Sequence, residues 1–595
     1  MNYRTPGVYV EEISLLPPSV AQVETAIPAF IGYTEKAAGD DGKPIWNVPT
    51  RIKSLLEYET YFGGSHKQSL LVTLADTAPF TPQSVSFNGG ESPYRMHQAL
   101  QLYFGNGGGP CFIISVGDFA SDTPRASLDA IDDYNELKAG LDAARKIDEI
   151  TLLVFPEADR LSTSNQVYDL YKDVLSQCYD LKDRFGVFDV LSDDSDGSSF
   201  RDNIGVNNLS YGAAYYPYLD SKIAYSHDDA GVTFATSSPA VFRENTLAEV
   251  ANVAAALNYM ADVQKAKAQA DKAVADAGTS DKAGKLAQYK IALRSTENAL
   301  NNAQRAMELV IDPAFDASDL EEAETELKAI TDLTVTSANT MVEIDTATTA
   351  LAGSTAKSEA AATIILAKIN GEQKIAEALN PDVTAYFTNA FLADLRNLLA
   401  EFTMAMPPSS AVVGIYARTD ATRGVWKAPA NVSINLINGP MVKVDNTDND
   451  SFNVHPTGKS INVIRAFTGK GTLVWGARTL DGNSNEWRYV PVRRFFNMVE
   501  ESVKKASEQF VFENNDANTW VKVKAMIENF LILQWRSGAL MGSKPEQAFF
   551  VNVGLGQTMT PDDVFNGRMI VEIGMAVVRP AEFIILRFSH KMLES

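Results

Sequence analysis

Short apolar runs alternate with amphipathic stretches between Pro28 and Leu219, and this alternation limits the fold of the 595-residue chain more than any other feature. The runs include PAFIGYT, CFIISVGDF and EITLLVFPEA, and the stretches include IKSLLEYETYF and LKAGLDAARKI. A run that is apolar on both faces suits a strand buried between two layers of helices. The sequence therefore predicts an α/β layer, in which nearly continuous apolar strands are covered by helices.

A region of different character follows this layer. Asp220 to Ala240 is polar and rich in turn formers, and the chain up to Met406 is then crowded with Ala, Asn, Thr, Gln, Lys and Glu. Ser318 with Glu321 has the spacing of a helix capping box, and Pro381 suits the first turn of a helix. Two apolar stripes have helical spacing and could pack together: Leu286, Tyr289, Leu293, Leu300, Met307 and Val310, and Phe387, Phe391, Leu395, Leu398 and Phe402. Such stripes usually bury locally, so we expect a helical bundle rather than a partner-binding groove.

The character of the first part returns after Met406. SAVVGIYAR, VSINLIN, INVIRAF and TLVWGARTL have strand character, and amphipathic helices are expected at Arg494–Gln509 and Trp520–Gly538. Phe583 to Phe588 is apolar on both faces, which suits a strand buried between other layers. We therefore expect an α/β (α+β) fold, with a mixed-sheet body built from the N- and C-terminal halves and split by a mainly helical insertion.

The N-terminal stretch TPGVYVEEI also alternates as a strand does. Val8 and Val10 fall on one side and Tyr9 and Glu11 on the other, and Pro17 with Pro18 ends the pattern. A single short strand is marginal in water, and its unpaired backbone groups are a template for another strand. The sequence therefore predicts a partner for this strand.

Composition excludes several classes of function. The formal net charge of -23 argues against a nucleic-acid binder, because phosphate neutralisation needs clustered Lys and Arg; solubility is the simpler explanation. Cys111 and Cys178 are far apart in apolar or helical surroundings, so we expect buried packing residues and no disulfide. The N-terminus lacks the apolar core of a signal peptide and no apolar run has membrane length, so we expect synthesis and folding in the cytoplasm.

Motifs for catalysis or cofactor binding are not found in the sequence. GNGGG at Gly105 to Gly109 follows a helical run and precedes a strand, the reverse of a phosphate loop, and is predicted to be a helix end and turn. TGKGT at Thr468 to Thr472 is predicted to be a hairpin turn. The five histidines are dispersed, and neither a GxSxG elbow nor a nucleophilic cysteine signature occurs. We therefore predict no enzyme, no cofactor, no metal site and no small-molecule substrate.

Motifs throughout the chain resemble, in order, those of one family. They are TPGVYVEE, AFIGYT, YFGNGGGPCFIISVGDF, DEITLLVFPEA, AAYYPYL, PPSSAVVGIYARTDATRGVWKAPAN, INVIRAF, GTLVWGARTL, VPVRRFFNMVEESV, FVFENND, GALMGSKPEQAFFVNVG and VVRPAEFIILRFSH. These residues resemble the sheath proteins of contractile phage tails and of related contractile injection systems. The resemblance covers nearly all of residues 1–219 and 407–595, and no family motif falls between Asp220 and Met406. It implies a subtilisin-like α/β body, without implying a protease triad.

The resemblance implies five parts and a mode of assembly. The parts are an N-terminal strand arm (1–24), the first part of the sheath core (25–219), an inserted helical outer domain (220–406), the C-terminal part of the core (407–578) and a C-terminal strand arm (579–595). Copies of the chain are expected to stack as hexameric rings around an inner tube, bounded by baseplate and terminal cap proteins, and to exchange their arms. The expected arm residues are Val8, Tyr9, Val10, Glu11 and Ile13, and Phe583, Ile584, Ile585, Leu586, Arg587 and Phe588.

Contraction of such a sheath would need no nucleotide, because an extended lattice that buries less surface than the contracted lattice stores free energy. Lys504 and Lys505, on the helix VEESVKKASEQF, are candidate contacts to an acidic tube surface. The alternative is a solvated lysine pair without a partner.

Two other classes of function stay open at this point. A surface-displayed helical adhesin or surface-layer-like protein would be favoured by a secretion signal, and an enzyme with an α/β body would be favoured by a catalytic constellation. Neither feature is found. A sheath subunit would act in an assembled phage tail or phage-tail-like particle, released by lysis or anchored to a membrane, without binding nucleic acid directly.

Overall fold

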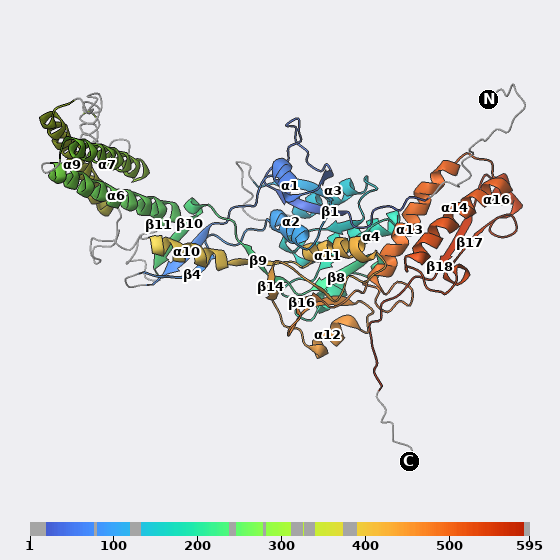
Figure 1. Cartoon of the computed structure of the whole chain (residues 1–595). Coiled ribbons are helices and arrows are strands. Elements are labelled where there is room, and N and C mark those ends of the chain that lie inside the picture. The colour runs from blue at the N-terminus through green and yellow to red at the C-terminus, as the bar shows by residue number, and fades with distance from the viewer. Residues whose placement is uncertain are drawn as a thin grey trace, which may run out of the picture. The chain divides into compact units, whose positions relative to one another are not determined.

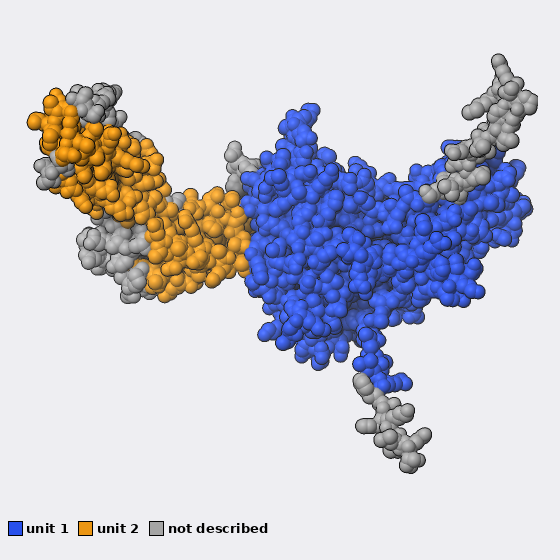
Figure 2. Space-filling model, viewed as in Figure 1, with its two compact units in different colours: residues 1–66, 93–223, 404–595 blue, residues 67–92, 224–403 orange. Residues whose placement is uncertain are grey.

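The structure is a computed structural model that describes residues 20–75, 80–119, 132–236, 245–277, 281–310, 325, 339–372 and 389–587 (Figure 1). The chain forms two compact units (Figure 2): unit 1 contains residues 1–66, 93–223 and 404–595, and unit 2 contains residues 67–92 and 224–403. The expected N-terminal strand from Val8 to Ile13, the capping box at Ser318, Pro381 and Phe588 lie outside the described residues.

A mixed nine-stranded sheet forms the centre of unit 1, with the strand order β13-β16-β15-β8-β7-β6-β1-β5-β2. The strands from β15 to β5 in this order are parallel to their neighbours, whereas β2, β16 and β13 pair antiparallel. The bounds are β1 Pro28–Thr34, β2 Thr50–Ile52, β5 Cys111–Asp118, β6 Leu152–Val154, β7 Phe185–Asp189, β8 Gly212–Tyr216, β13 Val432–Ser433, β15 Ile461–Phe467 and β16 Gly471–Val474. The α/β fold class with a mixed sheet is confirmed, and both halves of the chain contribute strands to this sheet.

Helices lie against both faces of the sheet. Ala29 and Ile31 of β1 belong to the core cluster that includes residues of α3 and α4, while the Phe30 ring lies 5.1 Å from the Tyr103 ring of α2. Because alternate residues of a strand point to opposite faces, α3 and α4 lie on one face and α2 on the other. The helices of this part are α1 Leu55–Phe62, α2 Met96–Gly105, α3 Asp132–Ala144, α4 Ser164–Leu181, α5 Ser198–Asn203, α11 Ser409–Arg423 and α12 Asn446–Asn453.

The run SAVVGIYAR, expected to be a strand, is part of the helix α11. Residues 409–416 of this helix are all buried, so apolar side chains occur on every face and the run shows no helical period. A buried helix segment of this kind cannot be told from a buried strand by periodicity alone. The helix packs against α2.

Three local predictions hold in the structure. Cys111 and Cys178 are both fully buried. GNGGG begins at the last residue of α2, and Gly107 has a φ of 96°, as a turn after a helix requires. TGKGT joins the antiparallel strands β15 and β16.

A smaller layer of two helices and a two-stranded sheet forms the C-terminal part of unit 1. The helices α13 Val490–Ser507 and α14 Ala517–Arg536, predicted by the sequence, pack with the two-stranded sheet of β17 Phe549–Val553 and β18 Val571–Met575 in one apolar core. Asp516 caps α14 by accepting from the N–H groups of Asn518 and Thr519. The short helices α15 Pro545–Ala548 and α16 Pro561–Phe565 lie on either side of β17 in the sequence. A separate three-stranded sheet contains β12 Thr403–Met406, β9 Leu219–Ala224 and β14 Ile437–Pro440.

Unit 2 combines long helices with a four-stranded sheet in the order β11-β10-β3-β4. The elements are β3 Leu70–Leu74, β4 Pro82–Phe87, β10 Val232–Thr236, β11 Asn245–Thr246, α6 Leu247–Ala277, α7 Lys282–Val310, α9 Met341–Glu372 and α10 Asn389–Glu401. The stripe on α7 packs against α6 and α9, whereas the stripe on α10 packs against β4 and α6. The described side chains of the two stripes therefore share one apolar core, and Phe387 lies outside the described residues.

Residues 67–92 belong to unit 2, whereas the resemblance implies a sheath core that includes them within residues 25–219. The cause is the parallel pairing of β3 with β10, from Leu70 opposite Val232 to Leu74 opposite Thr236. This pairing joins segments more than 150 residues apart, and local sequence does not reveal it.

Candidate functional site

An exposed apolar segment follows the last strand of unit 1. Phe583, Ile584, Ile585 and Leu586 are 70%, 78%, 78% and 72% exposed, and residues 581–587 form no strand (Figure 1). Burying apolar surface is worth about 25 cal/mol per Å², so a run of four exposed apolar side chains marks an interaction site. The sequence predicts a buried strand here. In the described part of its own chain the segment is neither buried nor paired, and its role as an arm stays a prediction.

Glu582, directly before this segment, is fixed to unit 1 by a partly buried hydrogen-bond network. Its carboxylate accepts hydrogen bonds from Arg478 Nε (2.9 Å) and Nη2 (2.6 Å), from Asn453 Nδ2 (2.7 Å) and from the Tyr489 hydroxyl (3.1 Å). Burial by itself would raise the pKa of Glu582, but the bonds from Arg478, Asn453 and Tyr489 lower it below its ordinary value. The chain is thus held at residue 582 and exposed from residue 583.

The two-stranded sheet of β17 and β18 has two open edges. In the part of the chain that the structure describes, each of these strands pairs only with the other. An open edge presents unpaired N–H and C=O groups, which favour the addition of a further strand. The sheet is therefore a candidate acceptor for an extended segment.

The register shows which backbone groups face outward. The Ala576 N–H donates to the Ala548 carbonyl (2.8 Å), so hydrogen-bonded and non-hydrogen-bonded pairs alternate from that point along the ladder. The residues whose N–H and C=O groups point to the outer edges are Phe549, Val551 and Val553 of β17, and Val571, Ile573 and Met575 of β18. Each edge thus offers up to about six ladder bonds.

The inner face of this sheet is only partly covered. Val551 is 2% exposed and Val553 is 8% exposed, whereas Val571, Ile573 and Met575 of β18 are only partly buried against the same core. On the outer face the Phe550 ring lies over Gly574, where any Cβ would overlap it. A strand added beside β18 would cover the half-buried side chains along that edge.

The chain near its N-terminal end is fixed to the same layer. Val20 is 8% exposed in the core shared by α13 and α14, and the Val23 N–H donates to Ser502 Oγ (3.1 Å). Thr25 Oγ1 donates to Asp420 Oδ2 (2.6 Å), and Arg494 Nη2 donates to the Thr25 carbonyl (2.8 Å). Residues 20–25 thus connect to α11 and α13 before the chain enters β1.

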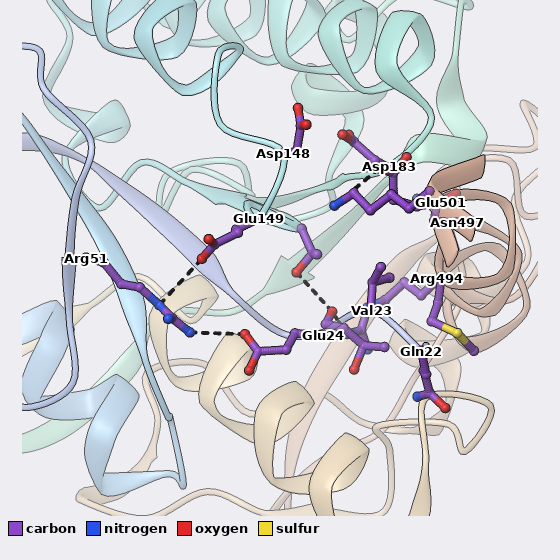
Figure 3. A pocket seen from close by; sticks show the side chains of 14 residues that line it. Gln22, Val23, Glu24, Arg51, Asp148, Glu149, Asp183, Arg494, Asn497 and Glu501 are labelled. Atoms are coloured by element: carbon purple, nitrogen blue, oxygen red, sulfur yellow. Dashed lines mark hydrogen bonds and ion pairs between the residues drawn. The ribbon is translucent and has the colours of Figure 1, made fainter. Parts of the chain in front are cut away.

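A cavity of about 380 Å³ lies beside this N-terminal segment (Figure 3). Its charged side chains form ion pairs: Arg51 lies 3.1 Å from Glu24 and 3.7 Å from Glu149, as Figure 3 shows. Asp183 is paired with Arg184 at 2.7 Å. Most charged side chains along the wall thus have a partner of opposite charge.

Lys504 and Lys505, the candidate tube contacts, both pair with the buried Glu501 on their own helix. The Nζ–Oε distances are 3.0 Å for Lys504 and 3.4 Å for Lys505. The hydrogen bond to Glu501 raises the pKa of Lys504. Lys504 is 63% exposed, so its ammonium group can still meet a partner, and the tube contact stays a prediction.

Other chemistry has little support in the described residues. No group of three or more His, Cys, Asp or Glu side chains there could hold a metal ion. Burial raises the pKa of the Cys111 and Cys178 thiols, which disfavours the reactive thiolate. Although α6, α7 and α9 are long, none of the described helices is apolar enough to span a membrane.

Sequence reasoning missed the residues that fix the two ends of unit 1. Asp420, Arg478, Arg494 and Glu582 are distant in sequence, and only their folded arrangement joins them. A signal was present in PAEFIILRF, where one carboxylate directly precedes the apolar run. A charge at such a boundary can mark the point at which a segment leaves its body.

Comparison with known proteins places this site in a family domain. Residues 483–591 match the family described as the phage tail sheath C-terminal domain. This segment contains α13, α14, both strands of the acceptor sheet and the exposed apolar segment.

Curated relatives match over part of their length. The tail sheath protein of Vibrio phage KVP40 is 27% identical over 129 residues, 21% of this chain and 19% of that protein. The putative prophage major tail sheath protein of Pseudomonas aeruginosa is 28% identical over 116 residues, 20% of this chain and 30% of that protein. The matched segment thus spans less than a third of either relative.

Solved structures match over nearly the whole chain. The helical sheath of the anti-feeding prophage in its contracted state is 25% identical, with a TM-score of 0.52 over 99% of this chain and 100% of that chain. The sheath complex of the extracellular contractile injection system PVC, in its contracted state, is 23% identical, with a TM-score of 0.51 over 99% of both chains. Residues 483–591 thus match the phage tail sheath C-terminal domain, and the whole chain is similar in fold to contractile sheath proteins.

Proposed function

We propose that this chain is the structural subunit of the contractile sheath of a phage tail or phage-tail-like injection system. The family domain at residues 483–591 and the similarity of the whole fold to contracted sheaths support this proposal. The homologues are structural sheath proteins, and we propose a structural role, not an enzymatic one, for this chain as well.

Neighbouring copies are joined by strand exchange in this proposal. The observation that carries it is the combination of an exposed apolar segment, Phe583 to Leu586, with an acceptor sheet that is open on both edges. A neighbour's segment would add to one edge of the sheet, and the N-terminal strand of another neighbour, Val8 to Ile13, would add to the other.

The strength of one such link follows from its bonds. About four to six ladder bonds at ~0.5–1.5 kcal/mol each stabilise an added strand by several kcal/mol. Burial of alternate apolar side chains, such as Phe583 and Ile585 on one face, adds to this. Each link is then strong enough to survive while the bodies of the subunits move.

The assembled sheath consists of stacked hexameric rings around an inner tube, bounded by a baseplate and terminal cap proteins. Contraction releases free energy stored in an extended lattice that buries less surface, so no nucleotide is consumed. Lys504 and Lys505 on α13 are the proposed contacts to the tube. The sheath acts in an assembled particle that is released by lysis or anchored to a membrane.

Electron microscopy of the purified full-length chain tests the proposal. We expect hollow striated cylinders for the wild type. Deletion of residues 1–19 or of residues 583–595 should leave monomers or short stacks. The N-terminal deletion stops at residue 19 because Val20 is part of the core.

A point variant with a matched control sharpens the test. Ile585→Asp places a charge on the exposed segment and should prevent cylinder growth, whereas Leu56→Asp, at a side chain 73% exposed on α1, should leave it intact. A small oligomer of fixed size that survives both deletions would contradict the proposed function.

A further inference from the structure

Each end of unit 1 is fixed by an arginine–carboxylate pair. We call Arg494, Asp420 and Thr25 the N-clamp, and Arg478, Glu582, Tyr489 and Asn453 the C-clamp. The N-clamp precedes β1 and the C-clamp follows β18, so each lies where the chain passes between the body and a terminal segment.

The N-clamp is a two-point ion pair with little access to water. Arg494 Nη1 lies 3.0 Å from Asp420 Oδ1 and Nη2 lies 2.5 Å from Oδ2, and the two side chains are 3% and 7% exposed. Thr25 bonds to both partners, through its hydroxyl to Asp420 and through its carbonyl to Arg494. The Tyr416 ring lies 4.7 Å from the guanidinium group and completes its surroundings.

The C-clamp has similar chemistry but holds a single residue of the terminal segment. Arg478 bonds to both carboxylate oxygens of Glu582, and its Nη1 also donates to the Asn453 carbonyl (3.2 Å). The Arg478 side chain is 4% exposed. Earlier in the chain than Glu582, the Val578 N–H donates a backbone hydrogen bond to the Ala539 carbonyl (3.1 Å).

We propose that the two clamps set how many residues at each end of the chain are free to act as an arm. Tension on an exchanged arm is then borne by the clamp and does not detach further residues from the body of the same subunit. This inference rests on the proposed sheath function. Arg478, Glu582, Arg494 and Asp420 are positioning residues in this role, since each forms its ion pair within its own chain.

The C-clamp controls a definite length of chain. If the hydrogen bonds to Glu582 break, the next fixed backbone position is Val578, and residues 579–582 become part of the free arm. Four residues span at most about 13–14 Å when extended. That extra length would loosen the spacing between linked subunits.

The two clamps differ in what supports them. The N-terminal segment is also held by Val20 in the core and by the Val23 bond to Ser502, whereas the C-terminal segment between Val578 and the exposed run is held through Glu582. Loss of one clamp bond should therefore affect the C-terminal arm more strongly.

The test compares Glu582→Gln with Glu486→Gln in assembled full-length sheaths, because Glu486 is an exposed carboxylate elsewhere in unit 1. A hydrogen bond to a charged group is worth enough to change an equilibrium roughly tenfold or more. We expect the Glu582→Gln sheath to disassemble in urea about tenfold faster than wild type, and its density map to show the chain leaving the body near residue 578. The Glu486→Gln sheath should match wild type.

The outcomes separate this inference from the proposed function. If the wild-type chain forms no cylinders, the proposed function fails. If wild type forms cylinders and Glu582→Gln disassembles at the wild-type rate with the chain still leaving at residue 582, the clamp proposal is overturned. Should Glu582→Gln not fold, Tyr489→Phe, which removes one C-clamp bond, is decisive. Faster disassembly of the Tyr489→Phe sheath supports the clamps, and an unchanged rate rejects them.

Discussion

Buried charged side chains of unit 1 occur in hydrogen-bonded sets. Asp189 accepts from the Ser409 N–H (2.7 Å), and Glu157 accepts from the N–H groups of Tyr33 and Arg95 (2.8 Å each). Burial raises the pKa of Asp189 to about 7 and that of Glu157 to about 7, although these hydrogen bonds lower both values. Buried carboxylates of this kind link the stability of the sheet to pH.

The first prediction concerns Asp189. An unfolded Asp titrates near pH ~4, so between about pH 4 and 7 the folded chain binds more protons than the unfolded chain, and stability should fall as pH rises through this window. Asp189→Asn keeps an oxygen acceptor for Ser409 and removes the titration. We expect its urea unfolding midpoint to depend less on pH than that of wild type, with a residual slope from Glu157.

Asp202→Asn is the control for this measurement, because Asp202 is exposed on α5. It should keep the wild-type slope. Equal slopes for wild type and Asp189→Asn would show that Asp189 is already ionised in the folded chain across this range.

At the scale of elements, the contact between α2 and α11 depends on a glycine. A Cβ built at Gly414 of α11 would overlap the Tyr103 carbonyl of α2. The two backbones therefore approach more closely than any larger residue allows. This close contact helps to hold the C-terminal half of the chain against the N-terminal half of the body.

Gly414→Ala is expected to destabilise unit 1 by about 1–3 kcal/mol, since the added methyl group must displace backbone. The sign of the change in unfolding free energy is informative, because Gly→Ala at an unstrained position normally stabilises a protein by ~0.4–1 kcal/mol. Urea unfolding of the full-length chain measures the change.

Ala421→Gly, at an exposed position of the same helix, gives the matched comparison. This variant should lower the free energy of unfolding by only ~0.5–1 kcal/mol, because glycine has a lower helix propensity than alanine. A stabilised Gly414→Ala variant would show that α2 and α11 can move apart freely.

At the scale of the whole molecule, unit 2 is built from two separate segments of the chain. Leu70, Val72 and Leu74 of β3 are at most 1% exposed, and β10 of the second segment pairs with β3. Deletion of residues 224–403 alone should therefore leave an apolar hairpin without cover, and we expect an aggregating chain. Soluble yield and size-exclusion chromatography measure this outcome.

Removal of both segments, 67–92 and 224–403, should instead leave a folded body. The cut ends are already adjacent, because the His66 ring lies 5.3 Å from the Tyr94 ring and Ser221 Oγ donates to the Met404 carbonyl (2.7 Å). Short Gly/Ser linkers can join them. If the single deletion is as soluble as the double one, residues 67–92 do not need residues 224–403 for cover.

Much of the element content could be predicted from local sequence. The apolar runs at Pro28 and Cys111 are strands of one sheet, α13 and α14 follow their amphipathic spacing, and the stripe on α7 is part of a helical core. These features depend on the period of side chains along one segment, which local sequence records. The strand expected at residues 410–418 is wrong, because this segment belongs to a helix that is buried on all sides and therefore has no such period.

The sequence by itself determined the α/β class, the mainly helical character of the long insertion and the apolar nature of Phe583 to Leu586. Only the tertiary structure decided that β3 and β4 belong to unit 2, that β17 and β18 leave two edges open, and that Arg478 holds Glu582 at the start of the exposed run. The physical reason is distance along the chain. Side-chain period is a local property, whereas strand pairing and buried ion pairs join residues that only the folded chain brings together.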